Sequence, residues 1–76
     1  MISIDFHGYT LEAAMIKAHD TVGQYRAAAL RHKPVDVEFI TGHGIIQHEL
    51  VKLLQGYGLT PRTKLGNTGC IICEIE

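Results

Sequence analysis

The fold is decided by residues 35–44, which read Val35-Asp36-Val37-Glu38-Phe39-Ile40-Thr41-Gly42-His43-Gly44. Apolar residues alternate with acidic ones up to Phe39, and this two-residue period predicts a half-buried β-strand. A glycine-rich loop follows at once, and the apolar residues beyond it recur at helical spacing: Ile46, Leu50, Leu53, Leu54 and Tyr57. The stretch therefore predicts a strand, a short loop and a helix that ends near Gly56 and Gly58.

The residues before this stretch predict a first strand that ends at Gly8. Ile2, Ile4 and Phe6 alternate with polar residues and are expected to face the core. Asp5 and His7 are then expected to share the opposite face of the strand, about 7 Å apart.

A first helix is predicted between these two strands. Thr10 is a typical helix N-cap, and an apolar stripe runs from there to about Leu30: Leu11, Ala14, Met15, Ala18, Val22, Tyr25 and Ala29. Arg31-His32-Lys33 place positive charge at the carboxyl end of the helix, before Pro34. A strand, a helix and a strand with short joins imply a right-handed crossover and two parallel strands.

The remaining residues predict two further strands. Thr60–Leu65 is a short strand that carries Arg62 and Lys64 on one side, Gly66–Gly69 is a turn, and Cys70–Ile75 is a last strand in a hairpin. Each helix has one apolar stripe, so both are expected to cover the same face of the sheet. The expected fold is a βαβαββ two-layer α/β (α+β) sandwich with a mixed four-stranded sheet.

Length and composition set further limits. The 76 residues form a single predicted domain, 1–76, with a net charge of −1, which argues against strong non-specific attraction to nucleic acid. No apolar run approaches the roughly 18–20 residues of a membrane span, and a cytoplasmic protein without a membrane partner is expected. Cys70 and Cys73 are expected to point to opposite faces of one strand, as buried structural residues rather than metal ligands.

The loops that follow the two parallel strands are the candidate functional site. Both strands end on the same side of the sheet, so His7-Gly8 and Thr41–Gly44 are expected to meet at one edge, where ligands bind in α/β proteins. Gly42 and Gly44 permit tight backbone conformations and the close approach of a ligand. The second loop leads into a helix, whose amino end favours an anion such as a nucleic-acid phosphate. A loop of this composition can equally serve only to turn the chain.

Three side chains could carry acid–base chemistry at this edge. His7 can exchange a proton near neutral pH, Asp5 could orient it, and His43 could donate to a phosphate oxygen or protonate a leaving group. This combination suits the cleavage of a phosphodiester. Two alternatives remain open: His7 could hydrogen-bond the neighbouring loop while Asp5 is solvated, or the three residues could bind a metal, although their spacing matches no strong ligand pattern.

The motifs, taken in order, resemble the Smr (small MutS-related) domain over essentially the whole chain. They are Ile4-Asp5-Phe6-His7-Gly8, a helix with Glu12-Ala13-Ala14, Ile40-Thr41-Gly42-His43-Gly44, and Asn67-Thr68-Gly69. The resemblance implies a fold similar to the C-terminal domain of a bacterial translation initiation factor. It places the family's functional Asp and His on Asp5 and His7, its glycine loop on Thr41–Gly44, and its Asn-x-Gly turn on Asn67 and Gly69.

Members of this family bind nucleic acid, and several nick DNA or cleave RNA. The resemblance implies an endonuclease that uses Asp5 and His7, and together with the residues at this edge it predicts a weak one in which Asp5, His7 and His43 are catalytic. The expected nucleic-acid contacts are Thr41, Gly42, Gly44, Arg62, Lys64 and Asn67. The chain departs from the family at His43, where Lys or Arg is frequent, and at Gln47 and His48, where a basic residue is frequent, so weaker phosphate attraction is expected.

Other functions remain open at this stage. The chain could bind nucleic acid without cleaving it, or it could act as a protein-binding module. The expected partner is DNA or RNA, and a homodimer or a larger repair or nuclease assembly is possible. No cofactor is expected, although a divalent cation would be compatible with the site.

Overall fold

Six elements form in the order that the alternation of periods predicts. The structure, a computed structural model, describes residues 1–29 and 33–76. The elements are β1 (Ile2–Asp5), α1 (Leu11–Ala29), β2 (Val35–Ile40), α2 (Ile45–Gly56), β3 (Arg62–Lys64) and β4 (Asn67–Ile75). The predicted βαβαββ order is therefore confirmed.

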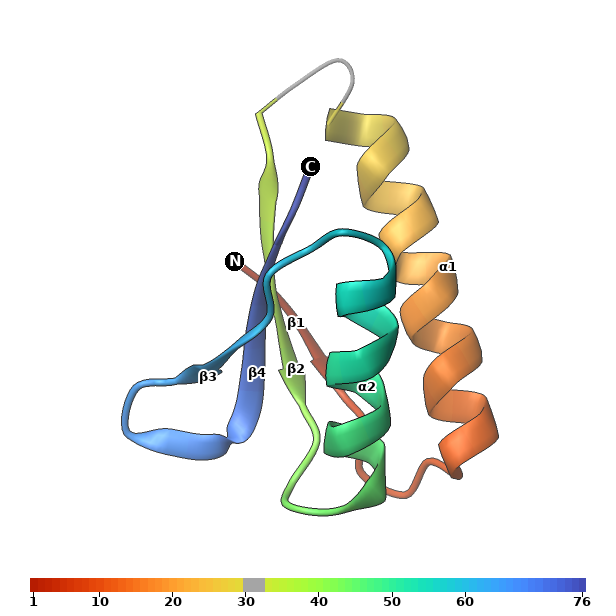
Figure 1. The fold of residues 1–76 in the computed structure, drawn as a ribbon, viewed down its shortest axis with the longest axis vertical. Coiled ribbons are helices and arrows are strands. Elements are labelled where there is room, and N and C mark those ends of the chain that lie inside the picture. Colours follow the sequence, from red (N-terminus) through yellow and green to blue (C-terminus); the bar gives the residue numbers. More distant parts are fainter. Residues whose placement is uncertain (30–32) are drawn as a thin grey trace.

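The four strands form one mixed sheet in the order β1-β2-β4-β3. β1 pairs with β2 in parallel, as a strand–helix–strand unit requires, and β4 runs antiparallel to both β2 and β3. Both helices cover the same face of this sheet (Figure 1). The predicted two-layer α+β architecture is thus confirmed.

The core lies between the sheet and the helices. Its strand residues alternate along β2 and β4, and its helix residues come from the two predicted apolar stripes. The fully buried members are Ala14, Ala18, Val37, Phe39, Leu50, Leu54, Cys73 and Ile75. Met15, Tyr25, Ile46, Leu53 and Tyr57 pack against them while partly buried. Leu11, the first residue of the predicted stripe, is 37% exposed.

The amino end of α1 has the predicted cap. The Thr10 hydroxyl accepts a hydrogen bond from the backbone N–H of Ala13 at 3.1 Å, which satisfies one of the helix's unpaired donors. The basic segment predicted at the other end, Arg31-His32-Lys33, begins outside the described residues, as does the expected helix end at Leu30.

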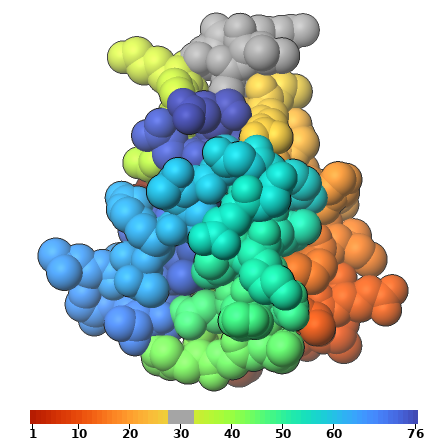
Figure 2. Space-filling view, viewed as in Figure 1, coloured from red at the N-terminus to blue at the C-terminus, as the bar shows by residue number. Residues whose placement is uncertain are grey.

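The β3–β4 hairpin differs from the prediction in the position of its turn. Lys64 pairs with Asn67, so the turn consists of Leu65 and Gly66, and Asn67–Gly69 belong to β4 rather than to the turn. Gly66 has a positive φ of 82°, which glycine adopts at little cost. The hairpin projects beside α2 in the space-filling view (Figure 2), and Leu65 at its tip is fully exposed.

Among the residues that the structure describes, neither helix combines the length and the apolar character needed to cross a lipid bilayer.

Candidate functional site

The loops after β1 and β2 meet at one edge of the sheet. They enclose a pocket of about 240 Å³ lined by Asp5, His7, Ile40, Thr41 and Gly42, which we call the strand-end pocket. Both loops lie at the same end of the molecule, beside the amino end of α2 (Figure 1). The parallel pairing of Asp5 with Ile40 explains this juxtaposition, because it aligns the last residues of the two strands. The structure therefore brings the two predicted segments together.

Asp5 and His7 both line the pocket, but they do not share a strand face as expected. β1 ends at Asp5, and the Asp5 carboxylate accepts a hydrogen bond from the backbone N–H of His7 at 2.8 Å. An Asp that bonds the backbone two residues ahead forms a turn in place of further strand. His7 consequently lies in the turn with its side chain exposed. The carboxylate orients the backbone of His7 through this bond.

The first half of the glycine loop is anchored to β4 by a single carbonyl. The backbone oxygen of Gly69 accepts hydrogen bonds from the N–H groups of Thr41 and Gly42, both at 2.9 Å, and from the Thr41 hydroxyl at 3.1 Å. These N–H groups are therefore engaged by the protein. Gly42 has a φ of 70°, in the left-handed region where a side chain is unfavourable. The loop is thus held in a conformation that requires glycine at this position.

His43 lies next to the strand-end pocket but does not line it. Its Nε2 is 2.7 Å from the hydroxyl of Thr68, on the neighbouring strand β4. The side-chain amide of Gln47 donates to the backbone oxygen of Thr68 at 2.6 Å. The structure therefore separates the three predicted catalytic side chains: Asp5 and His7 line the pocket, whereas His43 contacts Thr68 on β4.

The amino end of α2 follows directly. Gly44, the N-cap residue, has an extended backbone, and no side chain in the described part of the structure caps the helix there. The first intrahelical bond runs from the N–H of His48 to the Gly44 oxygen at 3.1 Å. Because the first N–H groups of a helix have no intrahelical acceptor, those of Ile45, Ile46 and Gln47 remain donors for solvent or an anion.

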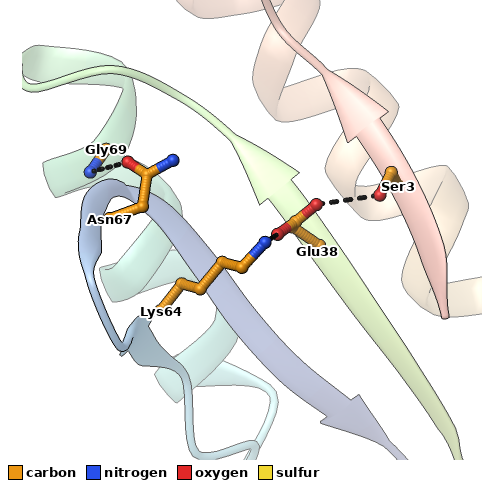
Figure 3. Close-up of polar contacts among 5 residues, drawn as sticks. All are labelled: Ser3, Glu38, Lys64, Asn67 and Gly69. Atoms are coloured by element: carbon orange, nitrogen blue, oxygen red, sulfur yellow. Dashed lines mark hydrogen bonds and ion pairs between the residues drawn. The ribbon is translucent and has the colours of Figure 1, made fainter.

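Lys64, a predicted nucleic-acid contact, is held in a network on the helix-free face of the sheet (Figure 3). Its ammonium nitrogen is 2.6 Å from Glu38 Oε2, and the Ser3 hydroxyl donates to Glu38 Oε1 at 2.9 Å. Lys64 and then Ser3 lower the pKa of the Glu38 carboxyl, against the opposing effect of burial. Glu38 in turn raises the pKa of Lys64. Much of the lysine's charge is therefore compensated inside the protein.

Arg62 and Asn67, the other predicted contacts on this hairpin, have different surroundings. Arg62 is exposed on β3. The side-chain oxygen of Asn67 accepts a hydrogen bond from the N–H of Gly69 at 3.1 Å (Figure 3). Asn67 thus shapes the start of β4, which carries the carbonyl that anchors the glycine loop.

The two cysteines are free and buried, on opposite faces of β4. Cys73 pairs with Val37 and lies in the core, where burial raises the pKa of its thiol, whereas Cys70 pairs with Ile40. Across residues 1–29 and 33–76, no three His, Cys, Asp or Glu residues gather closely enough to hold a metal ion. Asp5 supplies the one carboxylate among the residues that line the strand-end pocket.

Four residues of the site could not be assigned from the sequence. They are Gln47, which binds Thr68; Thr68, which holds His43; Gly69, which holds the glycine loop; and Glu38, which binds Lys64. The Asn67-Thr68-Gly69 motif drew attention to Thr68 and Gly69, but no sequence pattern indicated the contacts of these four residues. No family model, curated protein or solved structure matches this chain.

Proposed function

We propose that this chain binds the phosphodiester backbone of DNA or RNA at the strand-end pocket and cleaves it slowly, with His7 as general acid or base. One observation carries the proposal: an exposed imidazole and a carboxylate line the same pocket, next to the uncapped amino end of a helix. The resemblance of the Asp5–Gly8 and Thr41–Gly44 segments to the Smr domain supports the same reading. In this proposal the cytoplasm is the place of action.

His7 is the group best suited to move a proton. An imidazole titrates near neutral pH, so it can both accept and donate during phosphodiester cleavage. The bond from its own N–H to Asp5 fixes the backbone beneath it. Asp5 then has a second oxygen available to the ring, to a water molecule or to a divalent cation.

The phosphate would be held by partial positive charge rather than by lysine. The α2 donors at Ile45–Gln47 and the positive end of the helix dipole supply such charge directly after the glycine loop, and His43 precedes them. The Asp5 carboxylate opposes the approach of an anion, and a protonated His7 offsets it. Because the charges of Asp5 and His7 oppose each other at the pocket, the enzyme binds with modest affinity and cleaves slowly.

The decisive experiment compares wild type with His7→Ala on supercoiled plasmid and on single-stranded RNA, each with and without Mg²⁺. His48→Ala is the matched control, because His48 is an exposed histidine on α2 outside the pocket. Loss of a general acid–base group costs roughly 10²–10⁴-fold in rate, so His7→Ala should lose cleavage and His48→Ala should keep it. Cleavage that survives His7→Ala would contradict the mechanism.

A second candidate is a module that binds nucleic acid without cleaving it. It is favoured by the engagement of the Asp5 carboxylate with the backbone, because an oxygen held there is less able to polarise the imidazole. This candidate predicts that wild type and His7→Ala bind nucleic acid equally and that neither cleaves. Its binding should weaken steeply as salt rises.

A further inference from the structure

We infer that Thr68 is a positioning residue for His43. It holds the imidazole ring through Nε2, beside the strand-end pocket, and so leaves Nδ1 for a nucleic acid. The phosphate that Nδ1 contacts is the neighbour of the phosphate bound in the pocket. The last part of this inference rests on the proposed function, and the positioning itself does not. It assigns a role to Thr68 and moves His43 from proton transfer to binding.

The hydroxyl of Thr68 suits this task in both states of the imidazole. Its oxygen lies 2.7 Å from His43 Nε2. A hydroxyl can donate to a neutral ring nitrogen and can accept from a protonated one. The ring can therefore gain or lose a proton without leaving Thr68. In each case the second nitrogen, Nδ1, which has no hydrogen-bond partner among the residues that the structure describes, is left for a ligand.

Thr68 is itself held on both sides. Gln47 on α2 donates to its backbone oxygen at 2.6 Å. The next residue, Gly69, donates its N–H to Asn67 and accepts from Thr41 and Gly42. The position of the Thr68 hydroxyl relative to the glycine loop is thus set by bonds to α2 and to the loop itself.

The ring of His43 also rests on the backbone of β4. A Cβ added at Gly69 would lie 3.5 Å from His43 Cε1 and 3.4 Å from the Cα of Gly42. These are ordinary van der Waals distances, so the loop and the imidazole lie directly against this part of the strand. Because this packing turns the ring toward β4 and the pocket is lined without it, His43 is placed to contact a neighbouring phosphate rather than the reacting one.

Nuclear magnetic resonance tests the positioning without any ligand. The proximity of His43 Cε1 to Gly69 predicts a nuclear Overhauser cross-peak between the His43 Hε1 and Gly69 Hα protons. Thr68→Val, which removes the hydroxyl at similar volume, should abolish or weaken this cross-peak, and Thr68→Ser should retain it. Thr63→Val is the matched control, because Thr63 is exposed on β3. An unchanged cross-peak in a folded Thr68→Val chain would overturn the inference.

Binding of a fluorescein-labelled decathymidylate tests the consequence. Thr68→Val and His43→Ala should each weaken binding by about three- to tenfold, the range of one net hydrogen bond. The double variant should bind no more weakly than His43→Ala, because both changes remove the same contact, and Thr68→Ser should restore affinity. Additive losses would show that Thr68 acts independently of His43 and would overturn the inference. If the wild type fails to bind, the proposed function is what falls, and the cross-peak still decides the role of Thr68.

Discussion

The ammonium group of Lys64 on β3 reaches across β4 to lie 2.6 Å from the carboxylate of Glu38 on β2. The Ser3 hydroxyl on β1 binds the other oxygen of the same carboxylate. These contacts thus span the helix-free face of the sheet from one edge strand, β1, to the other, β3. The Glu38 side chain is 9% exposed and that of Lys64 is 44% exposed, so the pair is shielded from water on the glutamate side.

This network predicts a specific pH dependence of stability. A carboxyl with a lowered pKa stabilises the fold above its unfolded-state pKa of about 4.3, and its contribution is lost as pH falls through the folded value. A lysine with a raised pKa contributes below about pH 10.4, and that contribution is lost as pH rises through the folded value. Both contributions are therefore present at neutral pH.

Lys64→Met should lower the free energy of unfolding at neutral pH. It should also make this free energy fall less steeply as the pH is lowered, because Glu38 loses the cation that lowers its pKa. Urea unfolding followed by circular dichroism over the acid range measures this. Lys52→Met is the control: its pair with Glu49, at 3.7 Å, is much more exposed, and such pairs contribute roughly 0–1 kcal/mol. The same dependence of the free energy of unfolding on acid pH in the two variants would contradict the prediction.

Arg62 and Lys64 should contribute unequally to nucleic-acid binding. Arg62 is exposed on β3, whereas Glu38 already compensates Lys64. A residue that neutralises one phosphate contributes about one unit to the slope of log K against log salt. Arg62→Ala should remove about that amount, and Lys64→Ala should remove less. Titrations at several salt concentrations measure both slopes, and a larger loss for Lys64→Ala would refute the ranking.

Asp5 has a structural role and a charge, and two substitutions separate them. Asp5→Ala removes the acceptor for the His7 N–H and should destabilise the fold by about 1 kcal/mol. Asp5→Asn keeps an oxygen at the same place and should preserve stability while removing the charge. If the charge serves cleavage, Asp5→Asn should lose activity at full stability. Equal thermal midpoints for the two variants would show that the turn does not need this bond.

The glycines of the loop should differ in their tolerance of a side chain. Gly42 needs a positive φ, so Gly42→Ala should cost about 1–2 kcal/mol although the space around it is open. Gly44 is extended and has open space, and a serine there could cap α2. Gly44→Ser should therefore be neutral or stabilising by a few tenths of a kcal/mol. Chemical denaturation of the two variants tests the contrast, which fails if both lose stability alike.

The elements were predictable because each carries its own local signal. The alternation of Val35–Ile40 and the helical spacing from Ile46 to Tyr57 determine their structures over short stretches. Thr10 was recognisable as a cap for the same reason. The meeting of the two loops followed from one topological rule for parallel strands. Local pattern and chain order were thus sufficient for the fold and for the place of the pocket.

The contacts within the site were not predictable, because they join residues that are distant in sequence. Twenty-six positions separate Glu38 from Lys64, and twenty-five separate His43 from Thr68. No periodicity reports such pairs. The early end of β1 had a different cause: the Asp5 side chain accepts a hydrogen bond from the His7 N–H and turns the chain there, and alternation alone does not record this local bond.

The central place of β4 in the sheet bears on how the protein folds. β4 is the last strand along the chain, yet it lies between β2 and β3 and pairs with both. Its pairing with β3 is a local hairpin, whereas its pairing with β2 joins segments some 30 residues apart, as for Ile40 and Cys70. A pairing of the second kind slows folding, because the closure of the intervening loop costs entropy before any contact compensates for it. During synthesis, Thr41 and Gly42 leave the ribosome well before Gly69, the residue whose carbonyl fixes them. The Thr41–Gly42 side of the pocket therefore lacks its anchor until Gly69 has been synthesised and β4 has paired with β2.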